Sequence, residues 1–387
     1  MLHFPRSEFD MRIASTRTEL ARNGLDALLI FAQESHYYLT GFDTSSGYKF
    51  FQCAILTAIE SPITLLTRRP DLIQARRTST IEDIRIWYDA EGLNPAAELK
   101  ALLEEKNLRG TRIGVELATS GMTGAHWELL RTTLSDWCYL VDASSLIQLQ
   151  RAIKSDLEVT YVRRAAEIAD LALLRLYETA KPDVAEAAVE AAICSAVLSE
   201  DGDIVGAKVA LGSGPKALVA RVSTGGRVMK DGEQLTLEWA GVFRRYHAGI
   251  FRTLSIGRAK SEHRALFRTV NEALQAMTEV TRPGVPLGKI ADEHRRIFEE
   301  AGFTGQRESG AGYSVGATFP PRGLPDTPPL IYAGNQMPAQ PGMTLFLHAM
   351  YANEDTHAAM MLGYTVLVTP DGCEVLSKLV PEYHECV

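Results

Sequence analysis

The feature that most constrains the fold of this chain is a weak repeat within its second half. Residues 178–193, ETAKPDVAEAAVEAAI, resemble residues 279–294, EVTRPGVPLGKIADEH, since each has a helix end, a basic residue before proline, a turn and a new helix. Residues 230–242, KDGEQLTLEWAGV, resemble residues 340–352, QPGMTLFLHAMYA, as a glycine turn followed by an alternating strand. The repeat predicts two related halves around a pseudo-twofold axis.

Both repeated strands carry one ionisable residue within an apolar run. Glu238 and His348 each lie six residues after the glycine of the preceding turn. An isolated strand glutamate more often reaches solvent or pairs with an arginine, such as Arg244 or Arg252. The equal spacing favours a functional role, because two unrelated solvent-directed side chains would not be expected to share one register. We therefore predict that Glu238 and His348 are mates on facing strands of one cleft.

The length of 387 residues favours two domains. Helical and strand patterns alternate in the first part, beginning with an amphipathic helix over residues 6–24 and a buried strand over residues 25–32. Residues 1–150 are therefore expected to form a smaller α/β domain. A long amphipathic helix over residues 156–180 is expected to open the second domain, residues 151–387.

Composition disfavours several classes of partner and location. Hydrophobic residues make up 46% and charged residues 23% of the chain, as in ordinary globular proteins. A net charge of −8 argues against nucleic acid or an anionic membrane as the main partner. No segment approaches the roughly 18 apolar residues that span a bilayer, and the opening residues lack the pattern of a secretory signal. The five scattered cysteines indicate reduced thiols, so we expect a cytoplasmic protein.

Several stretches together resemble the pita-bread family, which includes prolidase, aminopeptidase P, methionine aminopeptidase, creatinase and ectoine hydrolase. They are RAIKSDLEVTYVRRAAEIAD, DGEQLTLEWAG, YHAGIFRTLSIG, GAGYSVG, QPGMTLFLH and TVLVTPDGCEVLS. The resemblance covers essentially the whole chain and looks closest to ectoine hydrolase. It implies a creatinase-like N-terminal α/β domain, a C-terminal α+β pita-bread domain with an internal pseudo-twofold, and a homodimer.

The metallopeptidases of this family hold two divalent metals with two aspartates, a histidine and two glutamates. The positions that match these ligands are occupied by Glu238, Gly249, Tyr313, His348 and either Gly363 or Tyr364. One carboxylate with a neutral histidine and a phenol cannot bind two hard dications tightly. The resemblance, with these replacements, therefore implies neither a metal site nor another cofactor.

The replaced positions suit proton transfer without a metal. The candidate catalytic residues are Glu238, His348, Tyr313 and His247. Glu238 would act as nucleophile or general base, and the two histidines would carry protons to the leaving nitrogen. Tyr313 would hydrogen-bond the developing negative charge. Two imidazoles near one carboxylate suit catalysis close to neutral pH.

The candidate substrate-binding residues are Arg221, Tyr246, Tyr48 and Lys49. Arg221 stands where creatinase and ectoine hydrolase have a histidine, and its guanidinium suits a substrate carboxylate. Tyr246 belongs to an RYH sequence that ectoine hydrolase shares. Tyr48 and Lys49 match the place where family members reach into a partner's cleft, so they are expected to contact substrate or the dimer partner.

The leading prediction is a metal-independent hydrolase of a C–N bond in a small amidine or amide that carries a carboxylate, as in ectoine hydrolase or creatinase. A metal-dependent Xaa-Pro dipeptidase or aminopeptidase is one alternative, which the ligand count disfavours. A non-catalytic pita-bread binding module is another. Binding modules of this family carry long charged extensions, which this sequence lacks.

Overall fold

The computed structural model describes residues 2–45, 47–204, 206, 209–303 and 311–387. The chain folds into two compact units, of which the N-terminal one contains Met1–Arg151 and Phe319–Arg322. The C-terminal unit contains Ala152–Thr318 and Gly323–Val387. The sequence did not indicate that the short segment Phe319–Arg322 groups with the N-terminal unit. Within these described ranges, no helix has the length and apolar content needed to cross a membrane.

A six-stranded mixed sheet forms the centre of the N-terminal unit, in the order β4-β3-β2-β1-β5-β6. All residues of β1 are buried, because apolar clusters cover both faces of the sheet, which explains the uninterrupted apolar run in the sequence. The strands are β1 (Ala27–Ile30), β2 (Cys53–Thr57), β3 (Thr64–Arg68), β4 (Asp83–Trp87), β5 (Arg112–Val115) and β6 (Tyr139–Asp142). The helices are α1 (Arg6–Arg22), α2 (Gln33–Thr40), α3 (Leu72–Thr78), α4 (Pro95–Glu105), α5 (Gly124–Thr133) and α6 (Ser144–Ala152), with the 3-10 turn η1 (Arg69–Asp71).

The C-terminal unit is built on one curved sheet, whose main path among the described residues runs β11-β10-β12-β13-β9-β8-β7. The strands are β7 (Ala210–Ser213), β8 (Gln234–Phe243), β9 (Tyr246–Ile256), β10 (Gly312–Val315), β11 (Pro325–Ile331), β12 (Thr344–Asn353) and β13 (Ala358–Thr369). Two short strands pair off this path, β14 (Gly372–Val375) with β13 and β15 (Glu385–Cys386) with β9. About the junction of β13 and β9, β12 is the counterpart of β8 and β10 of β7, while β11 has no counterpart on the main path.

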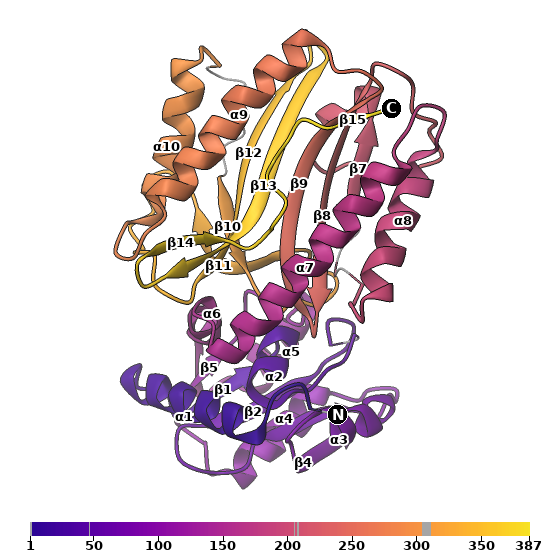
Figure 1. Cartoon of the computed structure of the whole chain (residues 1–387). Coiled ribbons are helices and arrows are strands. Elements are labelled where there is room, and N and C mark those ends of the chain that lie inside the picture. The colour runs from indigo at the N-terminus through magenta and orange to yellow at the C-terminus, as the bar shows by residue number, and fades with distance from the viewer. Residues whose placement is uncertain (1, 46, 205, 207–208, 304–310) are drawn as a thin grey trace. The chain divides into compact units, whose positions relative to one another are not determined.

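Two helix pairs cover the outer face of this sheet, one for each half (Figure 1). They are α7 (Asp156–Thr179) with α8 (Glu186–Ser199), and α9 (Ser261–Val280) with α10 (Leu287–Glu300). In each pair the second helix begins seven positions after the first one ends, and both second helices have 14 residues. The repeat in the sequence is thus a repeat in the fold, and the predicted α+β pita-bread architecture is confirmed.

The first of these helices starts where the sequence pattern predicts. The Ser155 side chain accepts a hydrogen bond from the Glu158 backbone N–H, and the Glu158 carboxylate accepts one from Ser155 N–H. This capping box satisfies two backbone donors that the helix itself leaves unpaired. Buried residues such as Val162, Ala169 and Leu173 then recur along one face, which packs on the sheet.

Candidate active site

Glu238 and His348 lie in one row across the inner face of the C-terminal sheet. Glu238 on β8 pairs with Phe251 on β9, Phe251 pairs with Gly363 on β13, and Gly363 pairs with His348 on β12. Cross-strand partners share a face of a sheet, so these positions all point to one side. Glu238 and His348 thus occupy equivalent places in the two halves. Their strands belong to a single curved sheet, whereas the sequence suggested two facing strands.

Tyr313 on β10 reaches across this face to Glu238. Its hydroxyl group donates a hydrogen bond to Glu238 Oε1 at 2.8 Å, and its ring centroid lies 5.8 Å from that of His348. Three strands separate β10 from β8, so a flat sheet would put about 19 Å between their backbones. The hydrogen bond therefore requires a strongly curled sheet. Glu238, Tyr313 and His348 line one concave surface.

The charge state of Glu238 depends on three influences. The side chain is half-buried, and loss of hydration raises the pKa of Glu238, while the hydrogen bond from Tyr313 and the charge of Arg221 lower it. Burial and the neighbouring carboxylate raise the pKa of the Tyr313 phenol well above its ordinary value. Tyr313 therefore stays protonated at neutral pH and donates to Glu238. This differs from its predicted role, because its one hydroxyl proton is directed to the carboxylate.

His348 is a neutral imidazole at pH 7. Its side chain is 7% exposed, and among the described residues its Nδ1 atom has no hydrogen-bond partner. Burial, followed by the nearby His294, lowers the pKa of His348 to about 4. The expectation that two imidazoles suit catalysis close to neutral pH is not supported for His348, because lost hydration dominates its pKa. His348 therefore has no imidazolium proton to donate at neutral pH, and its low pKa makes it a weak proton acceptor there.

Arg221 is an exposed residue in the segment that follows the 3-10 turn η2 (Gly214–Leu218). Leu218 and Ala220 pack against an apolar cluster of the inner face, which consists of Phe251, Val315, Phe346, Ala359 and Met361. The charge of Arg221 lowers the pKa of both Glu238 and Tyr313, so the guanidinium lies near the hydrogen-bonded pair. Arg221 has no ion-pair partner within the described part of the chain, so it is available to an anionic ligand.

His247 shares the inner face but is occupied by backbone contacts. Its Nδ1 lies 2.8 Å from the Arg245 carbonyl oxygen and 3.3 Å from the Thr318 hydroxyl group, and its Nε2 accepts from Gly206 N–H at 3.4 Å. Burial lowers the pKa of His247 to about 4. The side chain is therefore a neutral, hydrogen-bonded support for two loops. The structure does not bring it into contact with Glu238 or His348.

Tyr246 points to the opposite face of β9. Its hydroxyl group donates to Glu158 Oε1 at 2.7 Å, and its ring packs edge-on against Tyr161 of α7. The side chain is 1% exposed. The prediction of Tyr246 as a substrate contact is therefore not supported. Side chains alternate between the two faces along β9. Since His247 faces inward, Tyr246 faces outward and packs against helix α7.

Tyr48 and Lys49 lie in the N-terminal unit, in the loop between α2 and β2. Lys49 Nζ lies 5.6 Å from the centroid of the Tyr48 ring, and Lys49 is exposed. Because these residues belong to the other unit, their role as substrate or dimer contacts stays a prediction.

The donor set of the inner face does not fit two divalent cations. Gly249 and Gly363 supply no ligand, and an added Cβ atom at either position would lie 3.0 Å from the Phe346 ring. The space beside both glycines is therefore filled by an apolar side chain. Glu238 is left as one carboxylate beside a phenol and an imidazole, which is too little negative charge for two dications. Across the described residues, no three histidine, cysteine or acidic side chains cluster as metal ligands.

Phe346 is the residue of this site that the sequence analysis missed. It is fully buried and packs against Tyr313 and His348 with ring-centroid distances of 5.4 and 5.6 Å. The sequence pattern could have identified it, since Phe346 precedes His348 by two residues in an alternating strand and therefore lies on the same face.

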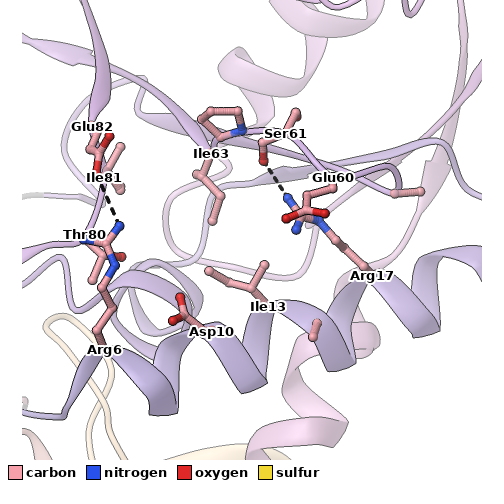
Figure 2. Close-up of a pocket in the computed structure, with 13 residues that line it drawn as sticks. Arg6, Asp10, Ile13, Arg17, Glu60, Ser61, Ile63, Thr80, Ile81 and Glu82 are labelled. Carbon is pink, nitrogen blue, oxygen red and sulfur yellow. Dashed lines mark hydrogen bonds and ion pairs between the residues drawn. The ribbon is translucent and has the colours of Figure 1, made fainter.

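A separate cavity of about 790 Å³ lies in the N-terminal unit between α1 and the loops that precede β3 and β4 (Figure 2). Both arginines that line it are engaged with their neighbours. Arg6 pairs with Glu82 at 3.3 Å, and Arg17 donates to the Ser61 carbonyl oxygen at 2.5 Å. None of the predicted site residues lines it. The inner face of the C-terminal sheet therefore remains the candidate active site.

Comparison with known proteins adds two family matches. Residues 160–370 match metallopeptidase family M24, and residues 12–153 match the creatinase/prolidase N-terminal domain. The uncharacterized hydrolase/peptidase y4tL of Sinorhizobium fredii is 30% identical over 389 residues, covering 97% of this chain and 96% of that protein. The ectoine hydrolase of Halomonas elongata is 27% identical over 395 residues, covering 97% of this chain and 96% of the enzyme.

Solved structures share the fold at lower identity. A prolidase from Thermococcus sibiricus superposes with a TM-score of 0.87 at 18% identity, covering 97% of this chain and 99% of that one. At this level of identity the match concerns the fold alone. The two-unit architecture is therefore that of the prolidases, while the side chains of the inner face differ from a two-metal ligand set.

Proposed function

The chain belongs to metallopeptidase family M24, a family of hydrolases, and we propose that it hydrolyses a C–N bond in a small amidine or amide without a metal ion. The observation that carries this proposal is the hydrogen bond of 2.8 Å between Tyr313 and Glu238 on the concave inner face. A half-buried carboxylate of raised proton affinity, oriented by a phenol, is suited to act as a general base or as a nucleophile.

Two routes use the same side chains. As a general base, Glu238 takes a proton from water while the water oxygen attacks the carbon of the C–N bond. As a nucleophile, Glu238 forms an acyl- or amidino-enzyme, which water then cleaves. In both routes the C–N bond breaks and the leaving nitrogen gains a proton. In the base route this is the proton that Glu238 took from water; in the nucleophile route it comes from a water molecule whose hydroxide then cleaves the covalent intermediate, and His348 would relay it to the nitrogen.

Arg221 gives the site its preference for an anionic substrate. The guanidinium is exposed, lies near Glu238 and has no ion-pair partner within the described part of the chain. A planar guanidinium binds a carboxylate through two parallel hydrogen bonds. The similarity to the Halomonas elongata ectoine hydrolase supports this substrate class.

The proposal is tested by an activity screen combined with metal analysis. Purified protein is assayed on ectoine, hydroxyectoine, creatine and X-Pro dipeptides before and after dialysis against a chelator. We expect turnover of an amidine or amide that survives dialysis, with less than about one equivalent of transition metal per chain. Two equivalents of metal, with peptide cleavage that the chelator abolishes, would establish the Xaa-Pro peptidase alternative instead.

A further inference from the structure

Three aromatic rings pack against one another on the inner face. The ring centroids of Tyr313, Phe346 and His348 are separated by 5.4, 5.6 and 5.8 Å. Phe346 pairs directly with Tyr313 across β10 and β12, and it is fully buried. It has no group that transfers a proton or contacts solvent. Any effect of Phe346 on a reaction must therefore act through its two neighbours.

The backbone around Phe346 leaves its ring little freedom. A Cβ atom at Gly249 would lie 3.0 Å from Phe346 Cδ2, and one at Gly363 would lie 3.0 Å from Phe346 Cζ. A Cβ atom at Gly312 would lie 2.3 Å from the Phe346 carbonyl oxygen. Glycine at positions 249 and 363 gives the phenylalanine ring the space that side chains would otherwise take, and glycine at position 312 lets β10 approach the Phe346 backbone. A ring enclosed this closely holds one position.

Tyr313, in contrast, depends on its neighbours for orientation. It lies on the four-residue strand β10, and the pairing of β10 with β11 shifts register between Tyr313 and Val315. Its phenol must nevertheless reach Glu238 across three intervening strands. A tyrosine side chain rotates about two bonds, so packing of the ring decides whether the hydroxyl group meets the carboxylate.

We propose that Phe346 is a positioning residue of the active site, which fixes the Tyr313 phenol against Glu238 and the His348 ring beside it. The inference rests on the proposed function for its effect on turnover, but the geometry it describes exists without substrate. An apolar wedge thereby orients the side chains at the place where other members of the family bind metals. Misplacement of a catalytic group by about 1 Å lowers rates by as much as 10²-fold.

The test combines kinetics with tyrosine vibrational spectra. Phe346→Ala is compared with Phe346→Leu, Tyr313→Phe and the double variant Phe346→Ala/Tyr313→Phe, using the compound turned over in the screen above. We expect Phe346→Ala to lower kcat by roughly 10- to 100-fold with KM little changed. The double variant should lose less than the product of the two single losses, because both changes remove the contact between Tyr313 and Glu238. Phe346→Leu should restore most of kcat.

Ultraviolet resonance Raman spectra test the geometry without a ligand. The difference between wild type and Tyr313→Phe isolates the signal of this phenol among the 13 tyrosines. In Phe346→Ala the tyrosine doublet of that signal should change its intensity ratio, because the hydrogen bond to Glu238 is lost. Leu254→Ala is the matched control, since Leu254 is equally buried but lies on the outer face of β9.

A purely structural role predicts a different result. Phe346→Ala would then lower the melting temperature as Leu254→Ala does, while kcat per folded enzyme and the Tyr313 signal stay as in the wild type. That pattern would overturn the inference. The proposed function has its own test in Glu238→Gln. If that change leaves turnover intact, the proposed function fails, and the Raman spectra alone decide whether Phe346 fixes Tyr313.

Discussion

The Glu238 carboxylate loses hydration on the inner face of the sheet and regains part of that loss from the Tyr313 hydroxyl group at 2.8 Å. Such a balance differs from that of an exposed glutamate or of a carboxylate fixed in a salt bridge. Glu233, only five positions earlier, is an example of the latter, with an ion pair to Arg227 at 2.5 Å that helps to lower the pKa of Glu233. The pKa values of these two glutamates are therefore shifted in opposite directions. Glu238, whose pKa is raised, is the one suited to take a proton.

We predict that Glu238→Gln lowers turnover by at least ~10², the scale expected for loss of a general base. Glutamine keeps the length of the side chain and accepts the hydrogen bond from Tyr313, so the melting temperature should change little. Glu233→Gln serves as the control, because it makes the same substitution at a neighbouring glutamate of the chain that lies outside the inner face. Wild-type turnover per folded molecule in Glu238→Gln, with a shifted melting temperature, would assign this glutamate a structural role.

The pH dependence of turnover reports the contact between Tyr313 and Glu238. If the reaction needs ionised Glu238, activity is lost as the pH falls through the pKa of Glu238. The hydrogen bond from Tyr313 lowers that pKa. Tyr313→Phe should therefore raise the pKa of Glu238 and move the acid limb of kcat/KM to higher pH. An acid limb that stays in place, or moves to lower pH, would contradict this assignment.

At the scale of elements, strand β9 depends on a glycine at the centre of the inner face. A Cβ atom at Gly249 would lie 2.4 Å from Leu324 Cδ2 and 3.0 Å from the Phe346 ring. We predict that Gly249→Ala destabilises the protein by about 1–3 kcal/mol, the usual cost of overpacking a core. Gly372→Ala on β14 is the control, since no atom lies within 4 Å of a Cβ atom there. Urea unfolding measures the stability of both variants. Equal unfolding midpoints would show that β9 accommodates an added methyl group at position 249 without loss of stability.

The fold could be predicted because the repeat fixes both the helix pairs and the strands they cover. The equivalence of Glu238 and His348 follows from that symmetry, although the two strands belong to one curved sheet and the sequence suggested facing strands. Periodicity also placed the start of α7 at Asp156, as the structure has it. These features depend on the order of residues along short segments, which can be read from a single sequence.

The contents of the site were harder to predict, because they depend on curvature and on long-range contacts. Alternation along β9 separates Tyr246 from His247, and it assigns the tyrosine to Glu158 on α7, 88 positions earlier. The hydrogen bond between Tyr313 and Glu238 exists only because the sheet curls. No periodic signal in a single sequence records that curl. The pKa values of the two histidines were likewise inaccessible, since they follow from burial.

At the scale of the whole molecule, the two units differ in their buried titratable groups. In the N-terminal unit burial lowers the pKa of His36 to about 3 and raises the pKa of Glu116 to about 7. Between the ordinary pKa values of glutamate and histidine, a fall in pH makes His36 destabilise the folded state and makes Glu116 stabilise it. In the C-terminal unit burial lowers the pKa of both His247 and His348 to about 4. Burial of His247 and His348 therefore makes the C-terminal unit sensitive to acid.

Whether a buried histidine stabilises or destabilises the fold as the pH falls depends on how many protons the folded and unfolded states bind. An unfolded histidine binds its proton near its ordinary pKa of about 6.5, whereas buried His247 resists protonation until about pH 4. Between these values the unfolded state holds more protons, so stability is complete above about pH 6.5 and is lost as the pH falls toward 4. One such group contributes a slope of about 1.4 kcal/mol per pH unit at most.

We predict that His247→Asn makes the C-terminal unit less stable at pH 7 and flattens its loss of stability between pH 6.5 and 4 by up to one proton. Asparagine keeps a donor for the Arg245 carbonyl oxygen but has no proton to gain, so the change isolates the titration. Urea unfolding at several pH values, followed by hydrogen exchange of peptides from β8 and β9, measures this slope. His357→Asn is the control, because His357 lies exposed in a turn with positive φ, which asparagine tolerates. Equal slopes for wild type and His247→Asn would mean that His247 is protonated in the folded protein as easily as in the unfolded chain.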